Sequence, residues 1–356
     1  MIELLTTLVA VVIGSVLIIW WLPYLVHELG HFVGARVAGA RFDFVPLGPF
    51  VVVQTPGGRR IRRLIRRYAC DATIPKTDAA FRQLFAAAAT GPLLNVALGV
   101  AAVWLAVDDR VARAWHFAPL LLIAVGFFMA GHGLGHLLPW RPRGFTSDGR
   151  RMLAILGRTP SARRWIALRI ITSLSESGIR PRDWHRELIE AVRSPGDGST
   201  DDIAAALVVY WHLLDSARPQ EARDCLESAR IAATLPYLPD DLERVVDSEL
   251  AYIEARLGAD PSLGAESLTR ARFVGPTSAG RVLAAVLLSY SYVDEARREA
   301  EVAREHLSEL RAGFALMEED LLNDLLEDCR RRSAGRPIDT QHTGAPGDGT
   351  KEQGAN

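Results

Sequence analysis

The chain has 356 residues, of which 49% are hydrophobic and 23% charged, and its formal net charge is −1 at pH 7. A net charge near zero argues against nucleic acid as the main partner, because binding phosphates needs a sustained basic surface. The cysteines (Cys70, Cys225 and Cys329) are far apart and odd in number, which argues against a disulfide framework and a cysteine-based zinc site. Almost all charge-free sequence precedes residue 141, so we expect a membrane-embedded first part and a water-soluble second part.

Three apolar segments have the length of membrane spans: residues 4–36, 83–107 and 116–140. A transmembrane helix needs about 20 apolar residues, and core helices of soluble proteins seldom extend so far without a charge. A secretory signal is the alternative for the first segment, but a basic start is missing and small residues suitable for cleavage lie too far downstream. The sequence therefore predicts a three-span membrane core within residues 1–155.

The charges flanking these segments predict an orientation. The stretch 58–82 is rich in basic residues (Arg59, Arg60, Arg62, Arg63, Arg66, Arg67, Lys76 and Arg82), whereas the link at 108–113 mixes acidic and basic residues. The positive-inside rule places the first stretch in the cytoplasm, where it would contact anionic headgroups of the lipid bilayer. We therefore expect a multi-pass protein of the cell (inner) membrane, with the N-terminus outside and the C-terminal region cytoplasmic.

Residues 42–54 follow the first span and contain several β-branched and aromatic residues. This composition predicts a strand or a small β-hairpin at the membrane interface. Such a hairpin could pair with an unwound substrate by strand addition. The alternative is a hairpin that merely covers the site.

A His-Glu-x-x-His motif, formed by His27, Glu28 and His31, ends the first span. Histidines four positions apart lie on one face of a helix and can bind one metal ion, while the Glu between them can reach a water on that ion. Zinc would lower the pKa of this water and Glu28 would accept its proton. The alternative is a pair of interfacial histidines beside a snorkelling Glu, although ionisable groups next to a span are costly and are functional candidates. The motif predicts a zinc site with Glu28 as the catalytic base.

Hydrolytic zinc sites normally have three protein ligands, so His27 and His31 leave one to be found. Asp148 is a hard oxygen donor after the third span, at the cytoplasmic end, where the first span also ends. An Asp-Gly pair taken alone is only a turn signal. His132 and His136, also four positions apart, are alternative ligands. The residues by themselves leave all three candidates open.

Taken together, these motifs resemble the site-2 protease family. The motifs are the His-Glu-x-x-His sequence, Gly91-Pro92-Leu93-Leu94-Asn95 in the second span, and a Leu-Pro stretch followed by Asp148-Gly149 after the third. The resemblance covers about residues 1–155. It implies an intramembrane zinc metalloprotease that hydrolyses peptide bonds in or near transmembrane segments of other membrane proteins. It also implies that His27, His31 and Asp148 are the ligands and that Glu28 is the base.

The chain departs from the family in two places. The family has an Asn before its Leu-Leu-Pro stretch and only a few residues before Asp-Gly, whereas this chain has His136 there and a longer insert before Asp148. We therefore expect Asn95 and His136 to line the substrate site. The alternatives are an interhelical hydrogen bond for Asn95 and a core position for His136.

Residues 160–330 predict successive helices separated by proline-containing turns. Three helical pairs stand out, at 204–214 and 221–229, at 250–257 and 263–271, and at 282–292 and 295–307. They weakly resemble tetratricopeptide repeats, which implies a cytoplasmic domain that could bind a protein partner. Packing alone would produce the same Ala and Leu pattern. The composition of residues 331–356 predicts a disordered tail.

The predicted fold is an all-α membrane protein with a three-span core and a small interfacial β-hairpin, followed by a tetratricopeptide-like helical domain. The predicted function is intramembrane zinc-dependent proteolysis. The alternatives are a catalytically weak or inactive membrane scaffold acting through its helical domain, and a soluble zinc peptidase whose apolar helices belong to its core.

Overall fold

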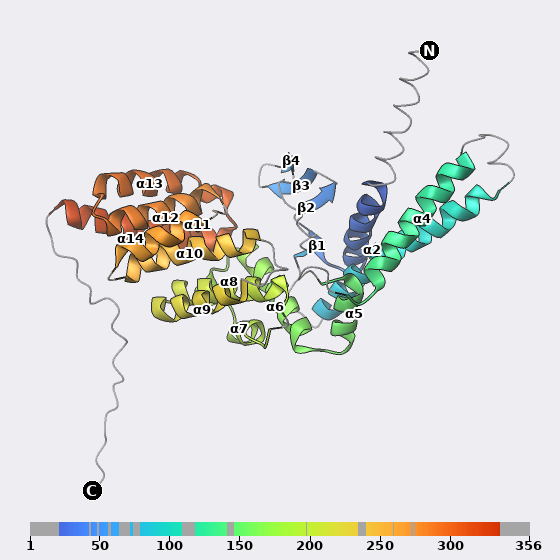
Figure 1. Ribbon diagram of the computed structural model, residues 1–356, viewed down its shortest axis with the longest axis horizontal. Helices are drawn as coiled ribbons and strands as arrows, with labels where there is room; N and C mark the ends of the chain where they lie inside the picture. Colours follow the sequence, from blue (N-terminus) through green and yellow to red (C-terminus); the bar gives the residue numbers. More distant parts are fainter. Residues whose placement is uncertain are drawn as a thin grey trace, which may run out of the picture. The chain divides into compact units, whose positions relative to one another are not determined.

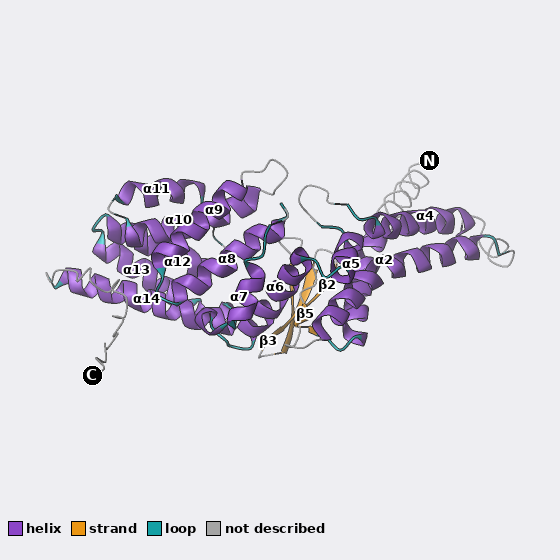
Figure 2. Cartoon of the chain, turned by 90° about the horizontal axis from the view of Figure 1, so that it is seen from below, coloured by secondary structure: helices purple, strands orange, loops and turns teal. Residues whose placement is uncertain are grey.

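The computed structural model describes residues 21–334 with gaps at 43, 48–49, 56–57, 64–71, 74–78, 109–117, 141–145, 197, 234–239, 259, 272 and 274. The described part is mostly helical (Figure 2). Residues 4–20 of the predicted first span, most of the link between the second and third spans, and residues 335–356 of the predicted tail lie outside the described residues.

The chain divides into two compact units. The first comprises residues 1–179, 183–209 and 232–239, and the second comprises residues 180–182, 210–231 and 240–356. Each unit is built mainly from helices (Figure 1). The first unit holds every residue of the predicted metal site.

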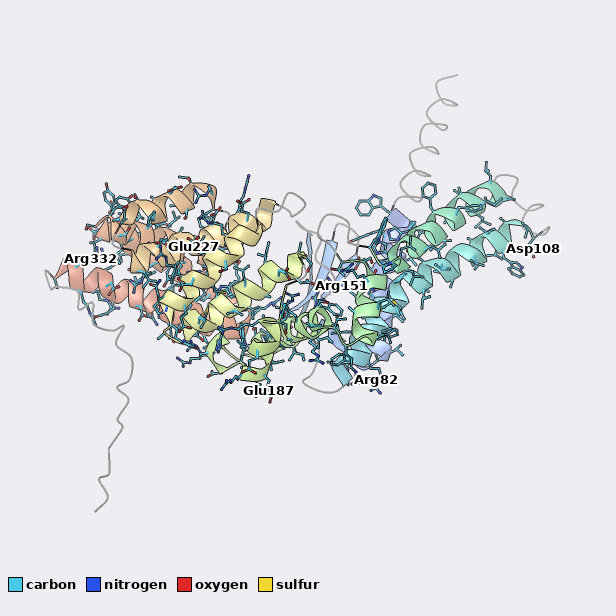
Figure 3. The ribbon with its side chains drawn as sticks, turned by 60° about the horizontal axis from the view of Figure 1, so that its bottom comes forward. Arg82, Asp108, Arg151, Glu187, Glu227 and Arg332 are labelled. Atoms are coloured by element: carbon cyan, nitrogen blue, oxygen red, sulfur yellow. The ribbon has the colours of Figure 1, made fainter. Side chains whose placement is uncertain are left out.

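Two helices of the first unit are long and apolar enough to cross a membrane: α2 (Ala79–Ala106) and most of α4 (Ala118–Leu137). In the most apolar 18-residue stretch of each helix, only 39% of α2 and 22% of α4 is buried. A core helix of a soluble protein would be mostly buried. The charged side chains of Arg82 and Asp108 lie near the two ends of α2 (Figure 3). Large apolar side chains are exposed on both helices: Leu93, Leu98, Val100, Trp104, Leu105, Leu120, Leu121, Phe127, Phe128 and Leu134. Surfaces of this kind suit hydrocarbon better than water.

Residues 21–37 form a third helix, which carries the His-Glu-x-x-His motif and packs closely against α2. A Cβ atom at Gly34 would lie 1.8 Å from Thr90 Oγ1 and 2.6 Å from the carbonyl oxygen of Ala86. A Cβ atom at Gly30 would lie 2.7 Å from the Cα of Gly91. Small residues allow helix backbones to approach closely in membranes, so these glycines set the distance between the motif helix and α2.

Replacing Gly34 with Ala should therefore destabilise the first unit, because the new methyl group overlaps the backbone and side chain of α2. We expect a loss of about 1–3 kcal/mol, the usual cost of overpacking, and a lower melting temperature of the detergent-solubilised chain by circular dichroism. Gly131→Ala is the matched control, since a Cβ atom there meets nothing within 4 Å. Equal melting temperatures for the two variants would contradict the close packing.

Short strands lie between the motif helix and α2 in sequence. Strands β2 (Phe44–Leu47), β3 (Phe50–Thr55) and β4 (Gly58–Arg63) form an antiparallel sheet, and β1 (Arg41–Phe42) pairs with β5 (Ala72–Thr73). In the register of this sheet Phe44 pairs with Val53, and Phe50 pairs with Arg63. The third strand, β4, is formed by the start of the Arg-rich stretch, for which the composition predicted contact with lipid headgroups but no strand.

Helices α5 (Asp148–Leu156), α6 (Pro160–Glu176) and α7 (Arg186–Val192) also belong to the first unit. Ile155 of α5 and Ile166 of α6 share one buried apolar cluster with Leu84 of α2 and Ala35 of the motif helix. The side chain of Thr159 caps α6 by accepting a hydrogen bond from the backbone of Ala162. The cluster holds α5 against the motif helix, which places the N-terminus of α5 near the histidines.

The helices of the pairs predicted after residue 200 are confirmed. They are α8 (Thr200–Asp215) and α9 (Pro219–Ala233), α10 (Asp240–Leu257) and α11 (Pro261–Arg270), and α12 (Pro276–Ser289) and α13 (Val293–Glu305). They are followed by α14 (Ala312–Ser333), and two 3-10 turns are formed by Pro181–Asp183 and Leu307–Glu309. Prolines at the first or second position of α11 and α12 start these helices at little cost, because the N–H that they lack would have no partner there.

The core of the second unit contains a buried ionic group centred on Arg281, whose side chain is fully buried. Its Nη2 atom lies 2.9 Å from Oε2 of Glu249, and its Nε atom lies 2.7 Å from Oε2 of Glu318. Tyr210 donates a hydrogen bond of 2.9 Å to Glu249. The group connects four helices. Three of them, α8, α10 and α12, are each the first helix of a pair, and the fourth is the last helix, α14.

Arg281→Met should destabilise the second unit by about 3 kcal/mol, because it leaves two carboxylates buried without their cation. Urea unfolding of the full chain in mild detergent, followed by tryptophan fluorescence, measures this loss. Arg297→Met is the control, since Arg297 pairs with Asp294 at an exposed site and should cost less than about 1 kcal/mol. Similar losses in both variants would contradict the role of the buried group.

Candidate metal centre

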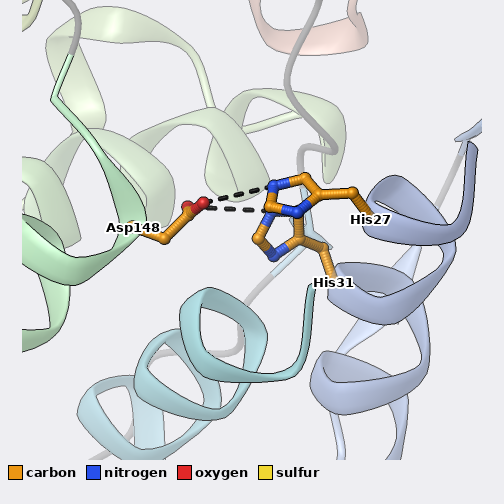
Figure 4. Close-up of side chains that lie close together, drawn as sticks. All are labelled: His27, His31 and Asp148. Carbon is orange, nitrogen blue, oxygen red and sulfur yellow. Dashed lines mark hydrogen bonds and ion pairs between the residues drawn. The ribbon is translucent and has the colours of Figure 1, made fainter. Parts of the chain in front are cut away.

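His27, His31 and Asp148 bring three ligand atoms within 4.8 Å of one another. The Nε2 atoms of the two histidines are 2.9 Å apart. Asp148 Oδ2 lies 3.2 Å from His27 Nε2, and Asp148 Oδ1 lies 3.7 Å from His31 Nε2 (Figure 4). Ligands of a tetrahedral zinc ion at 2.0–2.1 Å stand about 3.4 Å apart. The donor atoms of the two histidines and the carboxylate therefore already have nearly the spacing that one zinc ion requires.

The orientation of His31 is set by α2. Its Nδ1 atom donates a hydrogen bond of 2.6 Å to the carbonyl oxygen of Ala87. Because a carbonyl oxygen can only accept, the neutral ring carries its proton on Nδ1, and the Nε2 lone pair is left for a metal. The ring fills the space beside Gly91, where a Cβ atom would lie 2.5 Å from His31 Cε1. Gly91 is thus needed for the site as well as for helix packing.

Asp148 is placed by close contacts between the start of α5 and the end of α4. Ser147 caps α5 by accepting a hydrogen bond from the backbone of Arg150, and its hydroxyl also donates to the carbonyl oxygen of Leu138. A Cβ atom at Gly149 would lie 1.9 Å from the carbonyl oxygen of Leu137. The Asp-Gly pair therefore combines a candidate ligand with the residue that permits this close contact, in spite of the insert that precedes it.

The Asp148 carboxylate is held in its charged form. Burial alone would raise its pKa, but hydrogen bonds from His136 and His27, together with the nearby His31, outweigh burial and hold the pKa well below its usual range. His136 Nδ1 donates to Asp148 Oδ2 over 2.9 Å. A carboxylate that is already charged needs no deprotonation before it binds a cation.

Glu28 lies on the motif helix between the two histidines, and its Oε2 atom is buried without a hydrogen-bond partner among the described residues. Buried carboxylate oxygens normally have a partner. An unpartnered oxygen next to a candidate metal site is suited to accept a hydrogen bond from water. The Nδ1 atom of His27 is also buried and unpartnered within the described part of the chain.

The other predicted site residues lie beside this group. His136 contacts Asp148, whereas His132 accepts a hydrogen bond of 3.0 Å from Asn95. Among the described residues, neither histidine belongs to the set of three close ligand atoms. Asn95 is fully buried and also donates to the carbonyl oxygen of Pro23 over 2.8 Å, so it joins α2 to the motif helix.

The contacts that orient the candidate ligands could not be read from the sequence. They are the carbonyl oxygen of Ala87, the space beside Gly91 and the hydroxyl of Ser147. A carbonyl oxygen has no signature in the sequence. Gly91 did carry a signal, because small residues in an apolar helix allow close approach of a neighbouring helix, but that signal does not name the partner.

Two imidazoles and one carboxylate suit Zn²⁺, and catalytic zinc sites use this donor set with one position left for water. The same set also binds Fe²⁺ in non-haem oxygenases. Glu28, which lies between the two histidines on the same helix, is the feature that favours hydrolytic zinc chemistry, since a carboxylate there can accept a proton from water. The residues present therefore fit a catalytic zinc ion.

No family model, no curated protein and no solved structure matches this chain. The assignment of a function therefore depends on the geometry of the site and on the sequence motifs.

Proposed function

We propose that this chain is an intramembrane zinc endopeptidase of the site-2 protease type. The observation that carries the proposal is the convergence of the ligand atoms of His27, His31 and Asp148 within 4.8 Å, from two elements that are far apart in sequence. Glu28, with its unpartnered buried oxygen, lies between the two histidines of the motif in sequence. This is the minimum set for metal-assisted hydrolysis, namely three ligands and a base.

The exposed apolar faces of α2 and α4 support a site within the membrane. We infer that the segment at 4–36 forms a third span, that the N-terminus lies outside, and that the helical second unit lies in the cytoplasm. The metal site would then be close to the cytoplasmic face, since the basic stretch that follows the motif helix is expected on that side. A substrate with a transmembrane segment would reach it through the bilayer.

Each residue of the site has a separate role in the proposed reaction. Zinc held by His27, His31 and Asp148 would lower the pKa of a water molecule and polarise the carbonyl group of the bond to be cut. Glu28 accepts a proton from the attacking water and delivers it to the nitrogen of the leaving amine. His136 holds Asp148 in place by its hydrogen bond.

Two other parts of the chain would serve the same reaction. A peptide bond in a helix is shielded by backbone hydrogen bonds, so the substrate must be extended before it is cut. The sheet of β2, β3 and β4 could hold such a segment by strand addition. The helix pairs of the second unit would bind a protein partner or recruit the substrate.

Elemental analysis of the full chain purified in detergent, combined with cleavage of a single-span reporter protein, tests this function. We expect about one zinc per chain, cleavage that a chelator abolishes, and cleavage that added zinc restores. Iron in place of zinc would indicate oxygenase chemistry. A chain that holds no metal and cuts no reporter would favour a membrane scaffold.

A further inference from the structure

The hydrogen bonds of Asn95 define which nitrogen of His132 carries the proton. The Asn95 side chain donates from Nδ2 to the carbonyl oxygen of Pro23, and the same Nδ2 lies 3.0 Å from His132 Nδ1. The atom that faces Pro23 must be the amide nitrogen, because a carbonyl oxygen can only accept. An amide nitrogen only donates, so His132 Nδ1 must accept. The neutral ring of His132 therefore has its proton on Nε2.

This tautomer makes His132 a hydrogen-bond donor rather than a ligand. Its Nδ1 lone pair is occupied by Asn95, and its Nε2 carries a hydrogen. The ring is close to the candidate metal centre, with its centroid 5.1 Å from that of His27 and 4.6 Å from that of His136. The ring is partly exposed. A neutral ring that carries an N–H group therefore lies beside the candidate metal ligands.

We propose that His132 Nε2–H donates a hydrogen bond to the carbonyl oxygen of the scissile peptide bond as this oxygen gains negative charge during attack. Asn95 is the positioning residue that keeps His132 in the required tautomer. This inference rests on the proposed peptidase function. Donors that are fixed in advance at a developing oxyanion stabilise the transition state strongly, because they need no reorganisation when the charge forms.

The tautomer can be measured without metal or substrate. Nitrogen-15 NMR of histidine-labelled full chain in detergent distinguishes Nε2–H from Nδ1–H rings, and the signals of His132 are identified as those that vanish in His132→Gln. We expect the Nε2–H form in the wild type and a mixture of forms in Asn95→Leu, which removes both donated hydrogen bonds. An Nδ1–H ring in the wild type, or an unchanged tautomer in Asn95→Leu, would overturn the role of Asn95.

The donor role is tested with two amide substitutions. The side-chain nitrogen of Gln reaches about as far as Nε2 of histidine, whereas that of Asn reaches only as far as Nδ1. We expect zinc content to be unchanged in His132→Gln and His132→Asn. Binding of a phosphinic peptide, which imitates the tetrahedral transition state, should be at least about 10-fold weaker in the Asn variant than in the Gln variant. Reporter cleavage by the Asn variant should fall about 100-fold from wild type, with a smaller loss for Gln.

Loss of zinc from His132→Asn would make His132 a ligand and overturn the proposal, as would equal affinities of the two variants for the phosphinic peptide. Failure of the proposed function has a different signature. In that case the wild type holds no zinc and cuts no reporter, which removes the donor role as well, while the NMR measurement still reports whether Asn95 sets the tautomer of His132.

Discussion

Glu28→Gln lowers reporter cleavage by about 10³-fold, within the range that general acid–base groups contribute, while the chain keeps its zinc. Gln has nearly the shape of Glu but cannot accept a proton from water. Because Glu28 contributes no ligand atom to the group formed by His27, His31 and Asp148, metal binding should be unaffected. Single-turnover cleavage of the reporter and elemental analysis of the same preparation measure the two quantities together.

Glu187→Gln is the control for this variant, since Glu187 is exposed on α7 (Figure 3) and contributes no atom to the ligand group. It should leave both cleavage and zinc content at the wild-type level. A Glu28→Gln variant that cleaves as fast as the wild type would rule out Glu28 as the base. One that loses its zinc would instead make Glu28 part of the metal site.

Asp148→Asn weakens zinc binding by more than about 100-fold, above the 10–100-fold loss that is usual for residues that only support a ligand. The amide is neutral and a poor donor to zinc, and the variant also loses the charge held by His136 and His27. His136→Gln removes only a hydrogen bond to Asp148. The loss of zinc affinity in this variant should therefore stay within about 10–100-fold. Competition with a chelator of known zinc affinity places the two variants on one scale.

Asp183→Asn is the matched control, because Asp183 is exposed and lies outside the ligand group. Its zinc affinity should equal that of the wild type. If Asp148→Asn keeps full affinity while His136→Gln loses it, the third ligand is His136 and the assignment of Asp148 is wrong. Whichever variant, Asp148→Asn or His136→Gln, loses more zinc affinity therefore identifies the ligand, and the other residue is the one that supports it.

Much of the helical organisation could be predicted from the sequence, because it depends on local patterns. The apolar stretches at 83–107 and 116–140 correspond to α2 and α4, and the helical pairs after residue 200 were located from periodicity and prolines. The pairing of β3 with β4 was not predicted, because the Arg-rich composition of 58–63 indicated a membrane-anchoring loop. Cross-strand pairing compensates for weak strand propensity, and it depends on the partner strand.

The two histidines of the motif and Glu28 could be recognised from the sequence because their relation is local: four positions separate residues on one face of a helix. The third ligand is different, since Asp148, His132 and His136 are all compatible with the spacing of the spans. Only the tertiary structure separates them. Gly149 allows α5 to touch the end of α4, which brings Asp148 to the histidines, while hydrogen bonds engage His136 with Asp148 and His132 with Asn95.

The sequence by itself determined where the apolar helices lie and which helix carries the His-Glu-x-x-His motif, because both follow from the pattern of residues along one segment. The tertiary structure decided which distant donor completes the candidate metal centre, how His31 is oriented by Ala87, and which nitrogen of His132 is protonated. These properties depend on hydrogen bonds and close contacts between helices. Such contacts are possible because Gly30, Gly34 and Gly91 have no side chain to keep the motif helix and α2 apart.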